Sequence, residues 1–227
     1  MPEEVAHFLG PATTVAPRSR VRYFLSLVGM APAQADPDAF ALDMAGQEET
    51  NWCWSATTQA IEAHLHGRRP EQETIATEHV ATSRPGATCA PPDRRRTGGG
   101  HCIGPGNCSA ECNNTHDVTV VLAERGTRTS LLSNNAGVSF DSVRPEVAAA
   151  RPVICRMSFG GVGHFVCLAG AWAAPNGTRY VLVYDPWSAR AGHSVSAEWV
   201  AHDQFIAQYH SGTSVGRNTH AWAIRNS

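Results

Sequence analysis

Four residues whose side chains together support acyl transfer occur in order along the chain: Gln47, Cys53, His164 and Asp185. Cys53 lies at the predicted start of a helix, where unsatisfied backbone N–H groups and positive partial charge favour a thiolate. The imidazole of His164 could pair with that thiolate, and the carboxylate of Asp185 could orient the ring. The amide of Gln47 and the backbone N–H of Cys53 could then stabilise an oxyanion. The set indicates nucleophilic catalysis by a thiol.

The elements that must position these residues can be read from local patterns. The segment 53–66 (CWSATTQAIEAHLH) is predicted to be a helix, because Ala60, Ile61 and Leu65 share one face and Gly67 can end it. His164 opens an apolar run over 164–169, and Asp185 follows the β-branched run 180–184. If these two predicted strands pair, their ends bring an imidazole and a carboxylate together.

The remaining elements divide the chain into two halves. Short helices are predicted over 70–80, 116–125 and 142–150, and strands over 152–158 and 219–224. FGGVG and the Asn-Gly of AAPNGT are hairpin signals on either side of the strand that begins at His164. Helices first and strands later indicate an α+β domain with two lobes.

These motifs resemble the papain-like cysteine peptidases in their compact bacterial form, a group that includes staphopain-like proteases, cysteine-protease effectors and bacteriocin-leader peptidase domains. The resemblance is carried by QEETNWCWS, ARPVICRMSFGGVGHFVCLAG and YVLVYDPW, between about residues 44 and 190. It implies a helical lobe whose central helix carries Cys53 and an antiparallel β-sheet lobe. It also implies that Cys53 is the nucleophile, His164 the general base and then acid, Asp185 the orienting residue and Gln47 the oxyanion donor.

The resemblance implies hydrolysis of peptide bonds in a protein or peptide substrate through a thioester, with no metal or organic cofactor. The chain departs from plant and lysosomal members at Trp52, where they carry serine, and at Asp185, where they carry asparagine. Candidate substrate contacts are the residues beside the catalytic set: Trp52, Trp54, Gly163 and Trp187. The tryptophans could instead be core residues, and Trp187 could shield the His164–Asp185 contact from water.

Other functions fit the same residues. A thiol–imidazole arrangement also serves amidases on cell-wall peptides, transpeptidases, transglutaminases and deamidases, some of them toxins or effectors. Cys53 could also be a buried structural cysteine in an inactive, disulfide-stapled binding module. His193 is the main rival to His164, because it is near Asp185 in the sequence, but it has no strand setting.

The other six cysteines suggest disulfides. Four of them fall between Cys89 and Cys112, in a Gly-, Pro- and Arg-rich segment with little apolar side chain to bury. Zinc is the alternative for the group His101, Cys102, Cys108, Cys112 and His116, but its spacing lacks the C-x2-C pattern of structural zinc sites. Cys155 and Cys167 are placed symmetrically about Gly161, so they could be bridged or could be two inert core thiols.

Composition limits the partners. A net charge of −2 gives no reason to expect nucleic acid, and no apolar run is long enough to predict a membrane span. Residues 1–40 are expected to be a signal, a pro-segment or an N-terminal extension, because an arginine-rich stretch precedes an apolar run and Ala-Gln-Ala. The catalytic domain is expected over 41–227, with a cysteine-rich insertion at 86–116, in a secreted or exported monomer; cytoplasmic or effector-delivered protein is the alternative.

Overall fold

The computed structural model describes residues 37–83, 85–90, 101–103, 112–189 and 192–225, so nearly all of the predicted N-terminal signal or pro-segment lies outside the described residues. The described helices are α3 (Cys53–His66), α4 (Gln72–Ser83), α6 (Val118–Glu124), α7 (Phe140–Ala148) and α8 (His202–Gln208). The described strands are β1 (Asp38–Ala39), β2 (Thr88–Ala90), β3 (His101–Ile103), β4 (Arg128–Asn134), β5 (Val153–Phe159), β6 (Val162–Ala173), β7 (Arg179–Tyr184), β8 (Glu198–Ala201), β9 (Tyr209–Ser211) and β10 (Ser214–Arg225).

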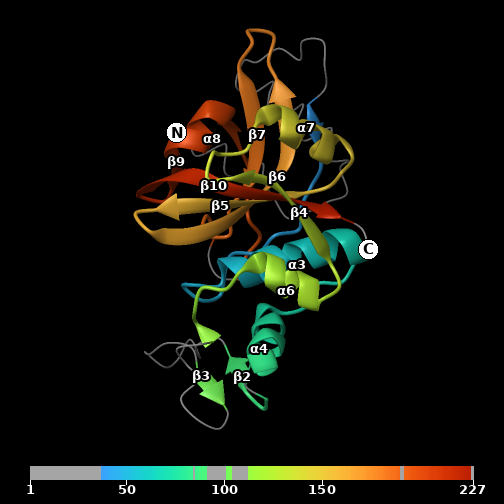
Figure 1. The fold of residues 1–227 in the computed structure, drawn as a ribbon, viewed down its shortest axis with the longest axis vertical. Helices are drawn as coiled ribbons and strands as arrows, with labels where there is room; N and C mark the ends of the chain where they lie inside the picture. Colours follow the sequence, from blue (N-terminus) through green and yellow to red (C-terminus); the bar gives the residue numbers. More distant parts are fainter. Residues whose placement is uncertain (1–36, 84, 91–100, 104–111, 190–191, 226–227) are drawn as a thin grey trace, which may run out of the picture.

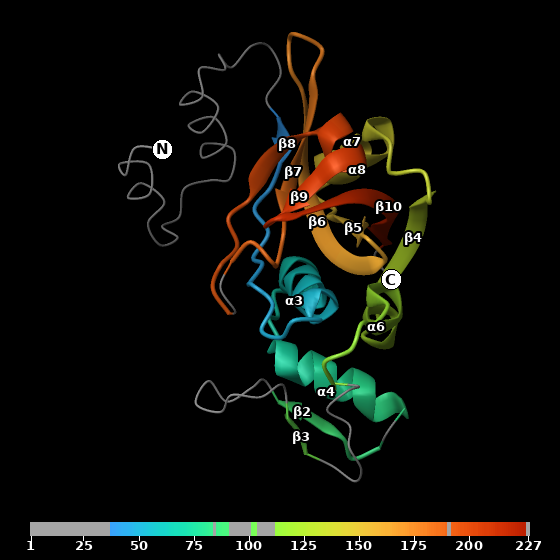
Figure 2. The ribbon, with the colours of Figure 1, turned by 90° about the vertical axis from the view of Figure 1, so that its left-hand side faces the viewer.

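One large antiparallel sheet organises the domain (Figure 1). Its strand order is β4-β10-β5-β6-β7-β8, with β1 paired to β6 and β9 paired to β10. Figure 2 shows α3 lying against the curved sheet, with α4 and the small β2–β3 sheet beyond it. The predicted α+β class, with a helix carrying Cys53 and an antiparallel sheet, is confirmed. The sequence did not predict β4, β8, β9 or α8, so helices and strands alternate more than expected.

Two hydrophobic cores lie on opposite faces of the sheet. One joins α3, α4 and α6 to sheet residues such as Ile154 and Cys167. The other joins α7 and α8 to sheet residues such as Cys155 and Val166. A sheet buried on both faces explains why β5, β6 and β7 read as continuous apolar runs and not as alternating ones.

Helix α3, which carries Cys53, is buried over most of its length. Every residue from Cys53 to Glu62 is buried. The helix ends where predicted, because Gly67 adopts the left-handed conformation with φ 62° and donates its N–H to the carbonyl of Ala63. A side chain at that φ would be strained, so glycine suits this position.

The register of the hairpin between β5 and β6 determines whether Cys155 and Cys167 can form a disulfide. Its register pairs Cys155 with Val166 and Ile154 with Cys167, so its centre lies between Gly160 and Gly161 and not at Gly161. A shift of this kind moves a side chain to the other face of the sheet. Cys155 and Cys167 therefore lie in different cores and are both free, buried thiols, so of the two alternatives that the sequence left open the structure supports two core thiols and excludes the bridge.

The cysteine-rich insertion contains one described disulfide, between Cys89 and Cys112, with Cα atoms 5.4 Å apart. This bond removes Cys112 from the alternative zinc site, and no group of three or more metal-binding side chains occurs among the described residues. Cys108, and the side chains of His101 and Cys102, lie outside the description. Expectations about their pairing stay predictions.

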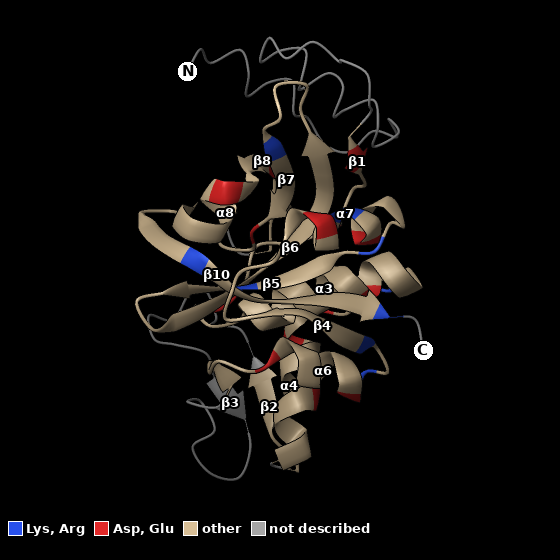
Figure 3. Ribbon diagram, turned by 45° about the horizontal axis from the view of Figure 1, so that its top comes forward, with Lys and Arg blue, Asp and Glu red and all other residues tan. Residues whose placement is uncertain are grey.

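Charges are distributed over the described surface without a single dominant patch (Figure 3). None of the described helices has the length and apolar character needed to cross a membrane. Asp38 and Ala39, which precede the expected start of the domain at residue 41, also belong to the fold, because they form β1 and pair with Ala171 and Gly170 of β6.

The disulfide should contribute measurably to stability. It closes a loop with a sequence separation of 23, so replacing Cys89 and Cys112 by alanine should lower the free energy of unfolding by about 3 kcal/mol. Chemical denaturation without reductant measures this difference. With reductant, wild type and variant should unfold at similar denaturant concentrations; equal stability without reductant would contradict the assignment.

Candidate active site

The centre of the site is a buried imidazole–carboxylate pair. His164 lies near the start of β6 and Asp185 directly follows β7, and the Nε2 of His164 is 2.6 Å from Oδ1 of Asp185. The two residues are 8% and 5% exposed. Because β6 and β7 pair antiparallel with Cys167 opposite Tyr184, the start of one strand meets the end of the other, as the sequence predicted.

Cys53 completes the arrangement from the opposite side of the ring. Its side chain is close enough to His164 for hydrogen bonding and charge at the sulfur to raise the pKa of the imidazole. Since Nε2 faces Asp185, Nδ1 is the ring nitrogen left for the sulfur. Cys53 is the first residue of α3, and Trp52 before it provides no side-chain cap. The sulfur therefore lies at a helix start whose N–H groups lack intrahelical acceptors.

These contacts set the charge of the pair. Burial disfavours a charged imidazole, but the hydrogen bonds and charges of Asp185 and Cys53 outweigh burial and raise the pKa of His164 to about 10. Burial likewise disfavours a charged carboxylate, but His164 and other donors outweigh it and keep the pKa of Asp185 below its usual value. The geometry thus favours an imidazolium between two acceptors at neutral pH.

Three further donors hold Asp185, and sequence reasoning missed two of them. Oδ2 accepts hydrogen bonds from Tyr209 Oη at 3.0 Å and Ser211 Oγ at 2.7 Å. Oδ1 also accepts the backbone N–H of Trp187 at 2.8 Å. Burial and the negative charge of Asp185 raise the pKa of Tyr209 above its ordinary value, so its hydroxyl stays a donor. Tyr209 and Ser211 belong to β9, a strand too short to leave a sequence pattern.

Gln47 is brought close to the site by its backbone. Its N–H donates to the carbonyl of Pro186 at 3.0 Å, which ties it to the turn that carries Asp185. Its side-chain Nε2, however, donates to the carbonyls of Glu49 at 2.8 Å and Thr50 at 2.7 Å. In this structure the amide therefore organises the loop before Cys53, and its predicted role as an oxyanion donor stays a prediction.

The tryptophans on either side of Cys53 require a correction. Trp52 and Trp54 were expected to contact substrate, but both are 0% exposed. Their indole N–H groups donate to the carbonyls of Cys112 at 2.6 Å and Asn114 at 3.0 Å. Both rings are core residues that fasten the end of the cysteine-rich insertion to the start of α3, and neither side chain is accessible to a substrate.

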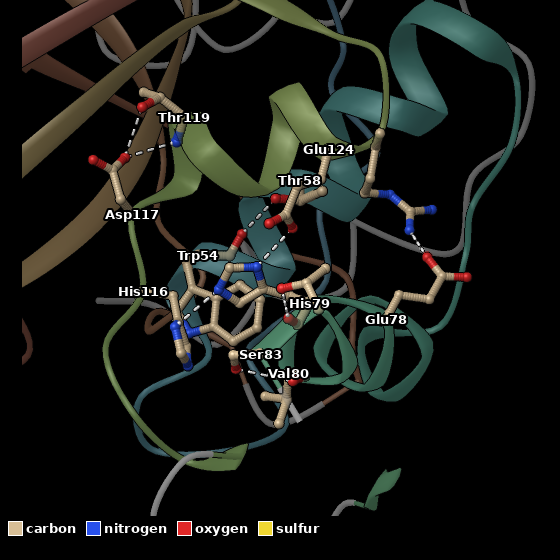
Figure 4. Close-up of polar contacts among 12 residues, drawn as sticks. Trp54, Thr58, Glu78, His79, Val80, Ser83, His116, Asp117, Thr119 and Glu124 are labelled. Atoms are coloured by element: carbon tan, nitrogen blue, oxygen red, sulfur yellow. Dashed lines mark hydrogen bonds and ion pairs between the residues drawn. The ribbon is translucent and has the colours of Figure 1, made fainter. Parts of the chain in front are cut away.

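A chain of polar side chains surrounds Trp54 (Figure 4). His79 Nδ1 is 2.7 Å from Glu124 Oε2, and His79 Nε2 is 3.0 Å from His116 Nδ1. Both imidazoles pack against the Trp54 ring, with centroids 5.6 and 4.9 Å away. These contacts join α4, the last residue of the insertion and α6 near the helix that carries the thiol.

The two other expected substrate contacts remain accessible. Trp187 is 50% exposed, so its ring provides only partial cover for the His164–Asp185 contact. Tyr209 and Ser211 enclose the Asp185 side of that contact instead. Gly163 is partly exposed, and a Cβ there would lie 2.9 Å from the guanidinium of Arg156. His193, the rival histidine, is exposed, and its carbonyl accepts the N–H of Gly46 at 2.7 Å.

The thiol, imidazole and carboxylate on a helix and an antiparallel sheet define the class of papain-like cysteine peptidases. Residues 41–215 match the model of the peptidase C39-like family. This match spans most of the 227-residue chain, so the chain belongs to that family, and the predicted class is confirmed. No curated protein matches the chain.

Solved structures similar to the chain include plant cysteine proteases. The bromelain protease from Ananas comosus in complex with the E64 inhibitor is 13% identical, with a TM-score of 0.41, over 82% of this chain and 95% of that one. The recombinant stem bromelain precursor is 14% identical, with a TM-score of 0.40, over 81% and 66%. The proform of the ragweed pollen allergen Amb a 11 cysteine protease is 12% identical, with a TM-score of 0.40, over 93% and 75%.

The charge on Asp185 should control the titration of His164. Asp185→Asn keeps an acceptor beside Nε2 but removes the negative charge, so the pKa of His164 should fall from about 10 by about 1–3 units. The imidazolium, stable up to about pH 10 in the wild type, would then be lost at lower pH. NMR titration of labelled histidine measures this shift. Asp141→Asn, at an exposed carboxylate, is the matched control; an unchanged His164 pKa in Asp185→Asn would refute the assigned pairing.

Proposed function

We propose that the protein is a cysteine peptidase that hydrolyses peptide bonds through a Cys53–His164–Asp185 triad and a thioester acyl-enzyme. The observation that carries the proposal is the position of the His164 ring. It bonds to Asp185 at 2.6 Å through Nε2, and its raised pKa reflects the nearby Cys53 side chain, which stands at a helix start without a side-chain cap. A thiolate–imidazolium pair held in this way is the nucleophile that acyl transfer requires.

The first half of the proposed cycle cleaves the peptide. The Cys53 thiolate attacks the carbonyl carbon, a C–S bond forms, and the carbonyl oxygen becomes an oxyanion. When the oxyanion collapses, the C–N bond breaks and the His164 imidazolium transfers its proton to the leaving amine. Asp185 holds the ring at the orientation in which Nδ1 faces both the sulfur and the leaving nitrogen.

The second half releases the acid product. Neutral His164 takes a proton from water as the water oxygen attacks the thioester carbonyl. Collapse of this second oxyanion breaks the C–S bond and restores the thiolate and the imidazolium. The backbone N–H of Cys53, in the first turn of α3, is the proposed first oxyanion donor. Gln47 is the proposed second donor, and in that role one amide hydrogen must turn from a loop carbonyl to the substrate oxygen.

The proposed setting is an oxidising one outside the cytoplasm. The Cys89–Cys112 disulfide supports this, because such bonds persist mainly in exported proteins. The proposed substrate is accordingly a protein or peptide met by an exported enzyme.

Alkylation tests the nucleophile. Iodoacetamide should label Cys53 in the native protein at neutral pH, because its thiol is paired with an imidazolium. Cys155 and Cys167 are internal controls: burial raises the pKa of Cys155 well above its ordinary value and that of Cys167 to about 12, so both should stay unmodified. Peptide mapping by mass spectrometry identifies the labelled residue.

Substitution tests the reaction. Cys53→Ala should abolish turnover while leaving the unfolding transition nearly unchanged, with Cys155→Ala as the matched thiol variant that keeps turnover in the folded fraction. Casein, peptidoglycan fragments and a glutamine peptide with a free amine are incubated with each variant and analysed by mass spectrometry. Cleavage of casein by the wild type supports the proposal. Near-wild-type turnover by Cys53→Ala would refute it, and so would products from only the peptidoglycan fragments or only the glutamine peptide with its amine.

Tyr209 and Ser211 should act as positioning residues for Asp185. The double variant Tyr209→Phe, Ser211→Ala removes both donors to a buried carboxylate oxygen, so kcat should fall about tenfold with KM little changed, and the free energy of unfolding should fall by about 1–3 kcal/mol. The single variant Ser211→Thr keeps the hydroxyl, so it should retain most of the wild-type kcat. Tyr180→Phe, on β7, is the control. Equal losses in kcat and in stability for the double variant and the control would contradict this role.

A further inference from the structure

The guanidinium of Arg156 lies beside Gly163, the residue before the candidate base. Arg156 is on β5, and its Nε and Nη2 atoms are 2.9 Å from the place where a Cβ on Gly163 would be. Gly163 directly precedes His164. A side chain at position 163 would displace the guanidinium from its present place, so Gly163 and Arg156 form one local unit.

Arg156 has no acidic partner within the described part of the chain. Its one described side-chain hydrogen bond is to Thr219 Oγ1, at 3.4 Å. Other partly buried arginines do pair: Arg151 and Arg225 both bond to Glu146, and Arg125 pairs with Glu62. Because a guanidinium has five N–H donors, Arg156 retains most of its capacity to bind an anion.

The neighbours of Arg156 leave it accessible. Cross-strand pairing places Arg156 between Phe165 of β6 and His220 of β10. Arg156, Gly163 and His220 are each partly exposed, although Phe165 on the same face belongs to the core that contains Cys53. His220 Nδ1 has no hydrogen-bond partner among the described residues. Among the described residues, this row thus contains a partly exposed guanidinium and an imidazole, and no carboxylate, beside the core that contains Cys53.

The proposed chemistry fixes which part of a substrate would meet this row. His164 must donate its proton to the leaving amine, so the leaving segment lies on the His164 side of the sulfur. Gly163 directly precedes His164 and meets the guanidinium of Arg156, and Arg156 shares with Phe165 the sheet face of the core that contains Cys53. A group on the leaving segment is therefore the part of a substrate that can reach Arg156.

We propose that Arg156 forms a carboxylate-binding subsite for the leaving segment of the substrate. Arginine matches a carboxylate with two parallel N–H···O bonds, which gives both affinity and orientation. The carboxylate can come from an Asp or Glu side chain or from the free C-terminus of a short leaving segment. This inference rests on the proposed peptidase function and names a substrate class for it.

Paired substrates test the subsite. First, wild-type protein digests a peptide mixture and mass spectrometry identifies a cleaved sequence. That sequence is then made in two matched pairs: Glu against Gln on the C-terminal side of the cleaved bond, and a free C-terminus against its amide. Wild type should cleave the carboxylate member of at least one pair with a kcat/KM about tenfold higher, and the pair that responds identifies the source of the carboxylate.

Variants assign the preference to Arg156. Arg156→Gln should remove it by slowing only the carboxylate member, and Arg128→Gln, at an exposed arginine of β4, should retain it. Arg156→Lys keeps the charge without the planar fork and should show an intermediate preference; it decides the matter if Arg156→Gln does not fold. Cleavage by wild type without any preference, or a preference that survives in Arg156→Gln and Arg156→Lys alike, would overturn the subsite alone. Failure of wild type to cleave any peptide would refute the peptidase function itself.

Discussion

The structure of the site depends on one buried contact, the 2.6 Å hydrogen bond between His164 and Asp185. A charged pair taken out of water is stabilising only when its remaining hydrogen-bonding capacity is satisfied. Asp185 meets this condition through Tyr209, Ser211 and the backbone of Trp187. Since two of these donors come from β9, which pairs with β10, the last part of the described chain helps to keep the carboxylate charged.

The same contact distinguishes the thiol that we propose as the nucleophile from the other free thiols that the structure describes. Three free cysteines are described, and all three are buried, so burial does not distinguish them. Cys155 and Cys167 lie within strands, where desolvation raises the pKa of each thiol. Cys53 instead begins a helix and has its side chain close to a ring that Asp185 keeps protonated. Reactivity follows from what surrounds the sulfur, and that arrangement requires α3 and the sheet to be docked together.

Much of this arrangement could be predicted because it has a local signature. Helical spacing and Gly67 mark α3, and apolar runs with glycine turns mark β5, β6 and β7, so Cys53, His164 and Asp185 could be placed at element ends. Tyr209 and Ser211 could not, because a three-residue strand has no periodicity and its partner in the site is more than twenty residues away in the sequence. Trp52 and Trp54 were misjudged for a related reason: aromatic residues beside a nucleophile can face the substrate or the core, and only the packing partner decides.

That packing partner is the cysteine-rich insertion, which gives it a role in the geometry of the thiol. Cys112 is joined to Cys89 by a disulfide, and its carbonyl accepts the indole N–H of Trp52, the residue just before the nucleophile. Asn114 accepts the indole of Trp54 in the same way. Both residues adjacent to Cys53 are thus fixed by a segment that the disulfide holds in place. A segment with few apolar side chains can therefore fix the start of α3, because a covalent bond and two hydrogen bonds replace the core it does not have.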